Sequence, residues 1–95
     1  MPYDAPVDTE FDPFKDAENR RIHGVSLALG ETVLRGPVGE AEDARRDYGE
    51  ARFRAFGYVE GRLFACTYTL RGRVRRIISV HRVREKEMRK WLGST

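Results

Sequence analysis

The chain has 95 residues, which is enough for one small domain with a modest hydrophobic core. Its single cysteine, Cys66, excludes an internal disulfide, and nothing in the sequence indicates secretion. No apolar run resembles a signal peptide or approaches the length of a membrane span, so we expect a cytoplasmic protein with no membrane partner.

Positive charge is concentrated in the C-terminal part of the chain, although the net charge is only +3. Residues 1–19 carry six acidic side chains and one basic one, whereas residues 71–95 carry nine basic and two acidic ones. A basic segment of this density attracts polyanions such as nucleic acids. A solvated arginine-rich surface without a ligand is the alternative, and charge alone does not separate the two.

The domain organisation is expected to be simple. Residues 1–9 contain two prolines and no periodicity, which predicts a flexible N-terminus, although 9–11 could form a short strand. A single domain is expected over residues 10–92.

Two helices are the first long elements that the sequence predicts. Asp12 before a proline is typical of a helix start and Gly24 is typical of a helix end, which predicts a helix over about 13–23. Ser26 is the next capping candidate and predicts a second, shorter helix over about 26–34.

Beyond this point the hydrophobic pattern changes to a period of two, which is typical of strands. It predicts strands over 51–55, 62–69 and 74–80, with 37–42 as a weaker edge strand. Short turns join them, so the pairing should be antiparallel. An amphipathic stretch over 84–92 predicts a closing helix. The expected fold class is therefore α+β, with two N-terminal helices, a four-stranded antiparallel sheet and a C-terminal helix.

Metal and cofactor chemistry is not indicated. His23 and His81 are far apart in the sequence, and neither forms a spacing that chelates a metal. The acids Glu42, Asp43 and Asp47 could ligate magnesium, although an acidic loop is the commoner explanation of such residues. Phosphate-binding loops and serine-nucleophile motifs are absent as well. We therefore expect no metal and no cofactor.

The remaining candidate chemistry lies on the last predicted strand and its flanks. Strict alternation places Arg73, Arg75, Ser79 and His81 on one face, and Val74, Ile78, Val80 and Arg76 on the other. Guanidinium groups bind phosphate oxygens and imidazole transfers protons near neutral pH, so the first face suits cleavage of an RNA phosphodiester. RNA supplies its own nucleophile, the 2′-hydroxyl. A surface histidine and a solvated arginine edge are the alternatives.

Three blocks of the sequence resemble one known family. They are FDPFK with Asn19 and HGVS over 11–26, DARRDYGEAR over 43–52, and RIIS with Arg82 and Glu87 over 76–87. In this order they resemble the motifs of the BrnT toxins. The resemblance implies a RelE-like fold and a metal-independent endoribonuclease that inhibits translation and growth as the toxin of a type II toxin–antitoxin system. The implied partner is a BrnA-like ribbon-helix-helix antitoxin, through which alone the toxin would reach operator DNA.

The resemblance also implies site residues. Transferred position by position, it implies functional roles for Arg71, Arg76 and Arg82, to which we add His81 as a proton-transfer residue. His81 stands where the family usually has arginine. Six further residues are expected to contact RNA: Arg45, Arg46, Tyr48, Arg73, Arg75 and Lys86.

Two functions of other classes would use the same basic surface. One is a non-catalytic module that binds RNA or the antitoxin. The other is a DNA-binding repressor, which is less favoured because no helix-turn-helix precedes the basic helix over 84–90. Cleavage of RNA by the wild-type protein separates the enzyme from both.

Overall fold

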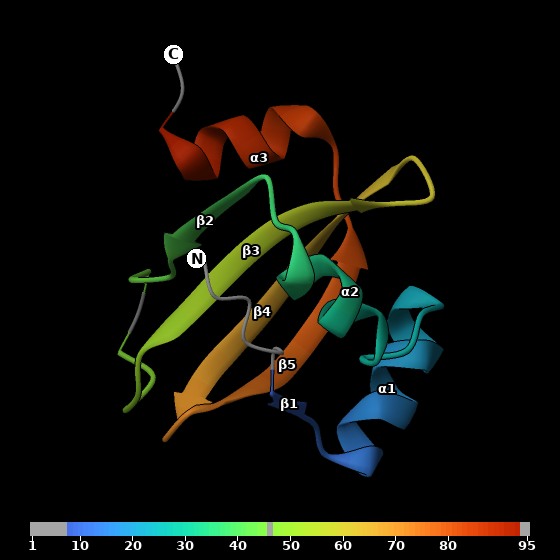
Figure 1. The fold of residues 1–95 in the computed structure, drawn as a ribbon, viewed down its shortest axis with the longest axis vertical. Coiled ribbons are helices and arrows are strands. Elements are labelled where there is room, and N and C mark those ends of the chain that lie inside the picture. The colour runs from blue at the N-terminus through green and yellow to red at the C-terminus, as the bar shows by residue number, and fades with distance from the viewer. Residues whose placement is uncertain (1–7, 46, 94–95) are drawn as a thin grey trace, which may run out of the picture.

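The computed structural model describes residues 8–45 and 47–93 of the chain. The elements follow in the order β1 (Thr9–Glu10), α1 (Pro13–His23), α2 (Leu29–Arg35), β2 (Gly39–Glu42), β3 (Arg52–Val59), β4 (Arg62–Arg71), β5 (Val74–Arg82) and α3 (Glu85–Leu92). Figure 1 shows one twisted sheet, with α2 against it, α1 beside β5 and α3 across one end. The α+β class predicted from the sequence is confirmed. Of the expected flexible segment 1–9, only residues 8–9 are described, and Arg46 also lies outside the described residues.

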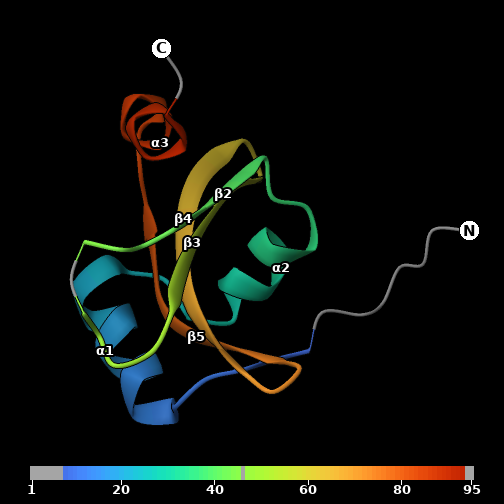
Figure 2. The same ribbon diagram turned by 90° about the vertical axis from the view of Figure 1, so that its left-hand side faces the viewer.

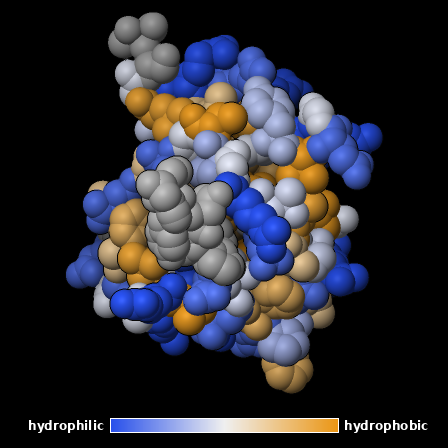
Figure 3. Space-filling view, in the orientation of Figure 1, coloured by the Kyte–Doolittle hydropathy of each residue, from blue (hydrophilic) through white to orange (hydrophobic). Residues whose placement is uncertain are grey.

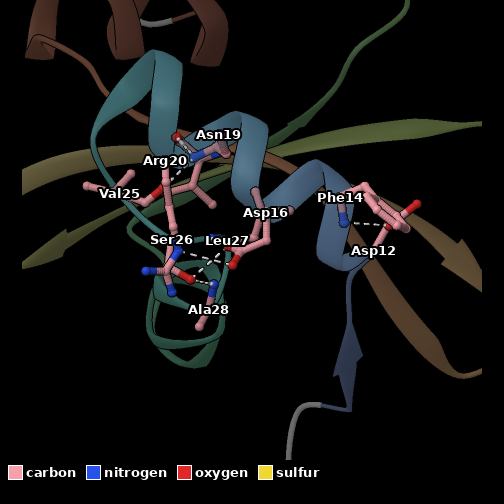
Figure 4. A network of polar contacts seen from close by, with 10 residues as sticks. Asp12, Phe14, Asp16, Asn19, Arg20, Val25, Ser26, Leu27 and Ala28 are labelled. Carbon is pink, nitrogen blue, oxygen red and sulfur yellow. Dashed lines mark hydrogen bonds and ion pairs between the residues drawn. The ribbon is translucent and has the colours of Figure 1, made fainter.

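Local signals explain where α1 begins and ends. The Oδ1 atom of Asp12 accepts a hydrogen bond of 2.8 Å from the backbone N–H of Phe14, which caps the first turn. Gly24 ends the helix in the left-handed conformation, with φ of 77°. Figure 4 shows α1 directing Asp16 and Asn19 toward the segment that leads into α2. There Asp16 Oδ1 accepts hydrogen bonds from the Ser26 hydroxyl, at 2.8 Å, and from the Leu27 N–H, at 2.7 Å.

The second helix begins later than the sequence predicts. Ser26 caps a turn, because its Oγ accepts a hydrogen bond of 3.0 Å from the Ala28 N–H, and α2 follows from Leu29 to Arg35. Within residues 8–45 and 47–93, no helix is both long and apolar enough to cross a membrane.

The sheet of the described residues is five-stranded and mixed, in the order β1-β5-β4-β3-β2. The prediction of four antiparallel strands is correct for β2 to β5 but omits β1 from the sheet. β1 pairs in parallel with β5, with Thr9 opposite Arg75 and Glu10 opposite Arg76. The short strand considered for residues 9–11 is therefore present as β1, but two residues are too few to show a strand period, and only the pairing shows that they belong to this sheet.

A β-bulge in β5 changes the face on which the arginines lie. Thr67 is opposite Ser79 but Tyr68 is opposite Ile77, so Ile78 is the extra residue. The assignment of faces by strict alternation is therefore wrong for the residues of β5 that precede Ile78. Arg76 shares a face with Ser79 and His81, and Arg75 lies on the other face, with its guanidinium 5.4 Å from the centroid of the Tyr68 ring.

The two faces of the sheet bury different clusters. On one face α2 packs on the larger core, in which Leu27, Val33, Cys66, Ile77 and Val80 are almost fully buried. On the other face α3 packs Met88, Trp91 and Leu92 on a small cluster of Phe56, Leu63 and Ala65. Figure 2 shows α2 and α3 on opposite sides of the sheet. Because α3 covers only one end of its face, polar side chains occupy the remainder.

Candidate active site

The face of the sheet that α3 partly covers carries two cross-strand rows of polar side chains. The register aligns Arg52 with Thr69 and Arg76 in one row, and Arg54 with Thr67 and Ser79 in the next. We call these six residues the polar face. Adjacent rows on one face are about 7 Å apart along a strand, so side chains from both rows can reach a common ligand.

His81 extends the polar face toward α3. It lies opposite Ala65 on β4 and stacks on His23 of α1, with the ring centroids 5.2 Å apart. Burial lowers the pKa of His81, and the positive charges of Arg54 and His23 lower it further, against an opposing effect of Glu87. The half-buried imidazole is therefore neutral at pH 7 and available to accept a proton.

Arg54 is the most enclosed guanidinium of the polar face, with its side chain only 10% exposed. Its Nη1 donates a hydrogen bond of 3.1 Å to Oε2 of Glu87 on α3. The guanidinium carbon lies 4.4 Å from the centroid of the Trp91 ring, a cation–π contact. Its Nε is buried and has no hydrogen-bond partner among the described residues.

Arg52 lies in the neighbouring row and has similar surroundings. Its guanidinium carbon is 4.1 Å from the centroid of the Tyr48 ring, and its Nε is 4.0 Å from Oε2 of Glu50. That Nε is also buried without a hydrogen-bond partner among the described residues. Glu50 pairs in addition with Arg71, at 3.8 Å, so Arg71 lies close to Arg52.

The loop between β2 and β3 attaches to the same region through Arg45. The guanidinium of Arg45 donates two hydrogen bonds of 2.9 Å to the buried carboxylate of Asp43 and lies 4.8 Å from the centroid of the Trp91 ring. The Tyr48 hydroxyl donates to the same carboxylate, at 3.1 Å. Chiefly through its hydrogen bonds with Arg45, the pKa of Asp43 is lowered to about 2. Asp43 thus organises the loop, and no role in metal binding is needed to explain it.

The structure separates the sequence-predicted residues into two groups. Arg71, Arg76 and His81 lie on or beside the polar face, where Arg76 forms an ion pair of 2.7 Å with Glu10. Arg73 is exposed in the turn between β4 and β5, and Arg75 lies on the face that α2 covers. These two are therefore not brought together with the others.

A basic groove runs beside α3. It has a volume of about 830 Å³ and is lined by Arg82, Val83, Arg84, Lys86, Glu87, Lys90 and Trp91. The predicted residues Arg82 and Lys86 thus belong to the groove. In Figure 3, hydrophilic residues gather along the top of the molecule, where Figure 1 places α3. Glu87 and Trp91 contact Arg54 as well, so the groove continues into the polar face.

No cluster of three or more histidine, cysteine or acidic side chains suited to a metal ion occurs within residues 8–45 and 47–93. The single thiol is no better placed for chemistry. Cys66 is fully buried in the core, and burial raises its pKa to about 12.

Sequence reasoning missed Arg54 and Glu87. Arg54 alternates with apolar neighbours on its strand, which predicts a solvent-facing side chain, whereas α3 covers that face and buries it. Glu87 belongs to the segment over 76–87 that resembles a family motif, but the residue that it contacts, Arg54, lies 33 residues away in the sequence. No local signal reports such a contact.

A basic α+β domain with guanidinium groups and a neutral imidazole on one sheet face fits the class of small RNA-binding or RNA-cleaving proteins. A family model described as "Ribonuclease toxin, BrnT, of type II toxin-antitoxin system" matches residues 11–87. The chain therefore belongs to the BrnT family, and the resemblance noted in the sequence is confirmed. Such a family implies an RNA substrate and an antitoxin partner. A search of curated protein sequences finds no match.

Proposed function

We propose that the chain is a metal-independent endoribonuclease that cleaves RNA and thereby inhibits translation and growth. The observation that carries the proposal is the position of His81. Burial and the charge of Arg54 lower the pKa of this imidazole, which favours its neutral form, and it lies on the same face of the sheet as Arg76. A neutral imidazole can accept a proton at neutral pH, and guanidinium groups stabilise additional negative charge on a phosphate.

In the proposed reaction, the 2′-hydroxyl of a bound nucleotide attacks the adjacent phosphorus. A bond forms between the 2′ oxygen and phosphorus, and the bond from phosphorus to the next 5′ oxygen breaks. His81 accepts the proton of the 2′-hydroxyl, and water protonates the departing 5′ oxygen, so the product carries a 2′,3′-cyclic phosphate. Arg76 stabilises the phosphorane, and Arg71 and Arg82 hold the phosphates on either side.

We propose that single-stranded RNA follows the basic groove and the loop between β2 and β3. Unstacked bases of RNA would stack on the Tyr48 ring and the Arg45 guanidinium in exchange for the contacts that these groups make with Arg52 and Trp91. Lys86 in the groove supplies a charge for a phosphate. Arg46, outside the described residues, and Arg73 remain proposed contacts, whereas the position of Arg75 on the α2 side argues against a shared role for it.

The test is cleavage of single-stranded and ribosome-associated RNA by purified protein in excess EDTA. We expect cleavage by the wild type, with a 2′,3′-cyclic phosphate end, and a loss of about a hundredfold or more in His81→Ala. Arg35→Gln, a change on the exposed side of α2, is the matched control and should cleave normally. Loss of wild-type activity on addition of EDTA would contradict the metal-independent mechanism.

The alternative of a non-catalytic binding module has one observation in its favour. In the described structure Arg71 and Arg76 rest in ion pairs, with Glu50 and Glu10 respectively. If the wild type binds RNA but cleaves none of the substrates, this alternative holds. If His81→Ala still binds RNA but no longer cleaves it, the interpretation of the chain as an enzyme is supported.

The proposal includes a partner and a setting. We propose a BrnA-like ribbon-helix-helix antitoxin that masks the toxin and carries it to operator DNA in the cytoplasm. A RelE-like fold and a single domain over 10–92 are part of the same proposal. Expression of the chain alone should arrest bacterial growth, and co-expression of the antitoxin should restore it.

A further inference from the structure

Two arginines of the polar face, on the same side of β3, each have a buried Nε–H group whose hydrogen-bonding capacity is unmet among the described residues. Arg52 and Arg54 are two residues apart, so their side chains emerge from one face about 7 Å apart. The Nε of each is buried without a hydrogen-bond partner among the described residues. An unsatisfied buried donor costs about 1–3 kcal/mol, so two side by side need an explanation.

The charge balance around these groups favours an anion. Glu50 lies near both Arg52 and Arg71, and Glu87 pairs with Arg54. Among the described residues, these three guanidinium groups thus share two carboxylates, and one positive charge of the cluster has no counter-ion. A phosphodiester group carries one negative charge and oxygen atoms that match the geometry of guanidinium donors.

We propose that Arg52 and Arg54 form an oxyanion subsite that binds one phosphate group of the RNA, and that this phosphate displaces Glu87 from Arg54. This inference deepens the proposed ribonuclease function and rests on it for the use of RNA. It adds to the site Arg54, which the sequence did not indicate, and Arg52, which ends the family-like block over 43–52 but had been given no role.

The exposure of the ion-paired side chains shows which partner can leave. Glu87 is 44% exposed and can turn into water, whereas Arg54 is 10% exposed and is packed against Trp91. When one partner leaves a buried ion pair, the other remains as an unpaired buried charge, which is unfavourable in free energy. Exchange of the exposed carboxylate for a phosphate oxygen keeps Arg54 paired at every stage, so Glu87 acts as a removable counter-ion.

The position of the subsite suits the adjacent chemistry. The row of Arg54 continues to Ser79 and the row of Arg52 continues to Arg76, and the charge of Arg54 acts on His81. A phosphate held at Arg52 and Arg54 therefore lies on the same face as the His81 imidazole, whose row is adjacent to that of Arg54. Its negative charge replaces that of Glu87.

The experiment is a phosphate titration read at the two guanidinium groups. Binding can be followed by the NMR signals of the arginine Nε–H groups and by fluorescence of Trp91, the single tryptophan of the chain. Sodium phosphate is compared with sodium chloride at equal ionic strength. We expect saturable shifts of the Arg52 and Arg54 signals with phosphate only.

Variants that change the ion pair test the exchange. Arg54→Gln and Arg52→Gln should each weaken phosphate binding by roughly tenfold. Glu87→Gln should tighten it several-fold, because the competing carboxylate is gone. The Arg35–Glu31 pair on α2 provides matched controls, and Arg35→Gln and Glu31→Gln should bind phosphate as the wild type does.

The outcomes are decisive even where a variant is poorly folded. If circular dichroism shows that Arg54→Gln is unfolded, Glu87→Gln decides, since tighter binding cannot result from unfolding. Unchanged or weaker binding in Glu87→Gln, or shifts that do not saturate in the wild type, would overturn the subsite.

A DNA tetranucleotide, which lacks the 2′-hydroxyl and cannot be cleaved in this way, separates the two sources of phosphate. Competition between the tetranucleotide and inorganic phosphate supports a phosphodiester of the substrate. Phosphate binding without such competition would reject the use of the subsite by RNA. Because no arm needs cleavage, an inactive protein that still binds phosphate would contradict the ribonuclease and leave the anion subsite standing.

Discussion

The imidazole rings of His23 and His81 stack with their centroids 5.2 Å apart and their planes inclined by 29°. This contact joins the last residue of α1 to β5, at the end of the polar face. Two imidazoles this close cannot both be protonated without mutual repulsion. Burial lowers the pKa of His81 most, and residues of three elements that are distant in sequence then adjust it: Arg54 on β3 and His23 on α1 lower it, and Glu87 on α3 raises it.

The pKa of His81 should respond to its neighbours with predictable sign. In His23→Ala the pKa of His81 should rise, because a positive charge that lowers it is removed, although burial and Arg54 continue to hold it down. In Glu87→Gln it should fall, because the carboxylate that raises it is gone. NMR titration of the imidazole protons measures both shifts. Shifts of the same sign in the two variants would contradict this account.

Asn19 should be a major source of stability. Its side-chain amide donates hydrogen bonds to the carbonyls of Val25, at 2.9 Å, and Val80, at 2.8 Å, and accepts one of 3.1 Å from the Val80 N–H. Asn19→Ala leaves these buried groups unpaired, so the free energy of unfolding should fall by about 2–4 kcal/mol in urea denaturation. Lys15→Ala, on the exposed side of α1, should change it by less than about 0.5 kcal/mol.

Gly30 should not tolerate alanine, although alanine is the better helix former. A Cβ at this position of α2 would lie 2.8 Å from Cys66 Sγ and 3.0 Å from Ile77 Cδ1. Because these atoms are packed in the core, Gly30→Ala should destabilise the fold by about 1–3 kcal/mol. Gly36→Ala, at a position with no heavy atom within 4 Å of a Cβ, is the control. Equal unfolding temperatures for the two variants would show that α2 does not pack as described.

Asp43 should contribute stability that disappears in acid. Its folded pKa of about 2 lies below the ordinary value of 3.8, so its contribution is present above pH 4 and is lost as the pH falls toward 2. Asp43→Asn should lower the free energy of unfolding at pH 7 by about 2 kcal/mol and flatten its decline below pH 4. Glu60→Gln, in the exposed turn between β3 and β4, should leave that decline unchanged. Denaturation curves at several pH values measure both.

Much of the fold could be predicted because its signals are local. The cap at Asp12 and the left-handed Gly24 bound α1 as expected, and the alternating and apolar runs of the sequence became β2 to β5. The start of α2 was displaced because Ser26 caps a turn before the helix. The parallel strand β1 was not placed in the sheet because it depends on pairing with residues 75–76.

The candidate site was predicted less well, for a physical reason. One extra residue, Ile78, reverses the side-chain alternation that precedes it, so the expectation for Arg75 and Arg76 was inverted. A bulge is stabilised by the pairing of two whole strands and by the packing of Ile77 in the core. The amino-acid types near Ile78 do not distinguish a bulged strand from a regular one.

The order of elements, the α+β class, the basic C-terminal part and the family motifs were all determined by the sequence, since each depends on neighbouring residues or composition. Tertiary structure alone decided that the charge of Arg54 acts on the pKa of His81. Arg54 is buried only because α3 folds back over β3 and places Glu87 and Trp91 against it. Contacts between residues so far apart in the chain form when the whole domain packs, and short-range pattern does not encode them.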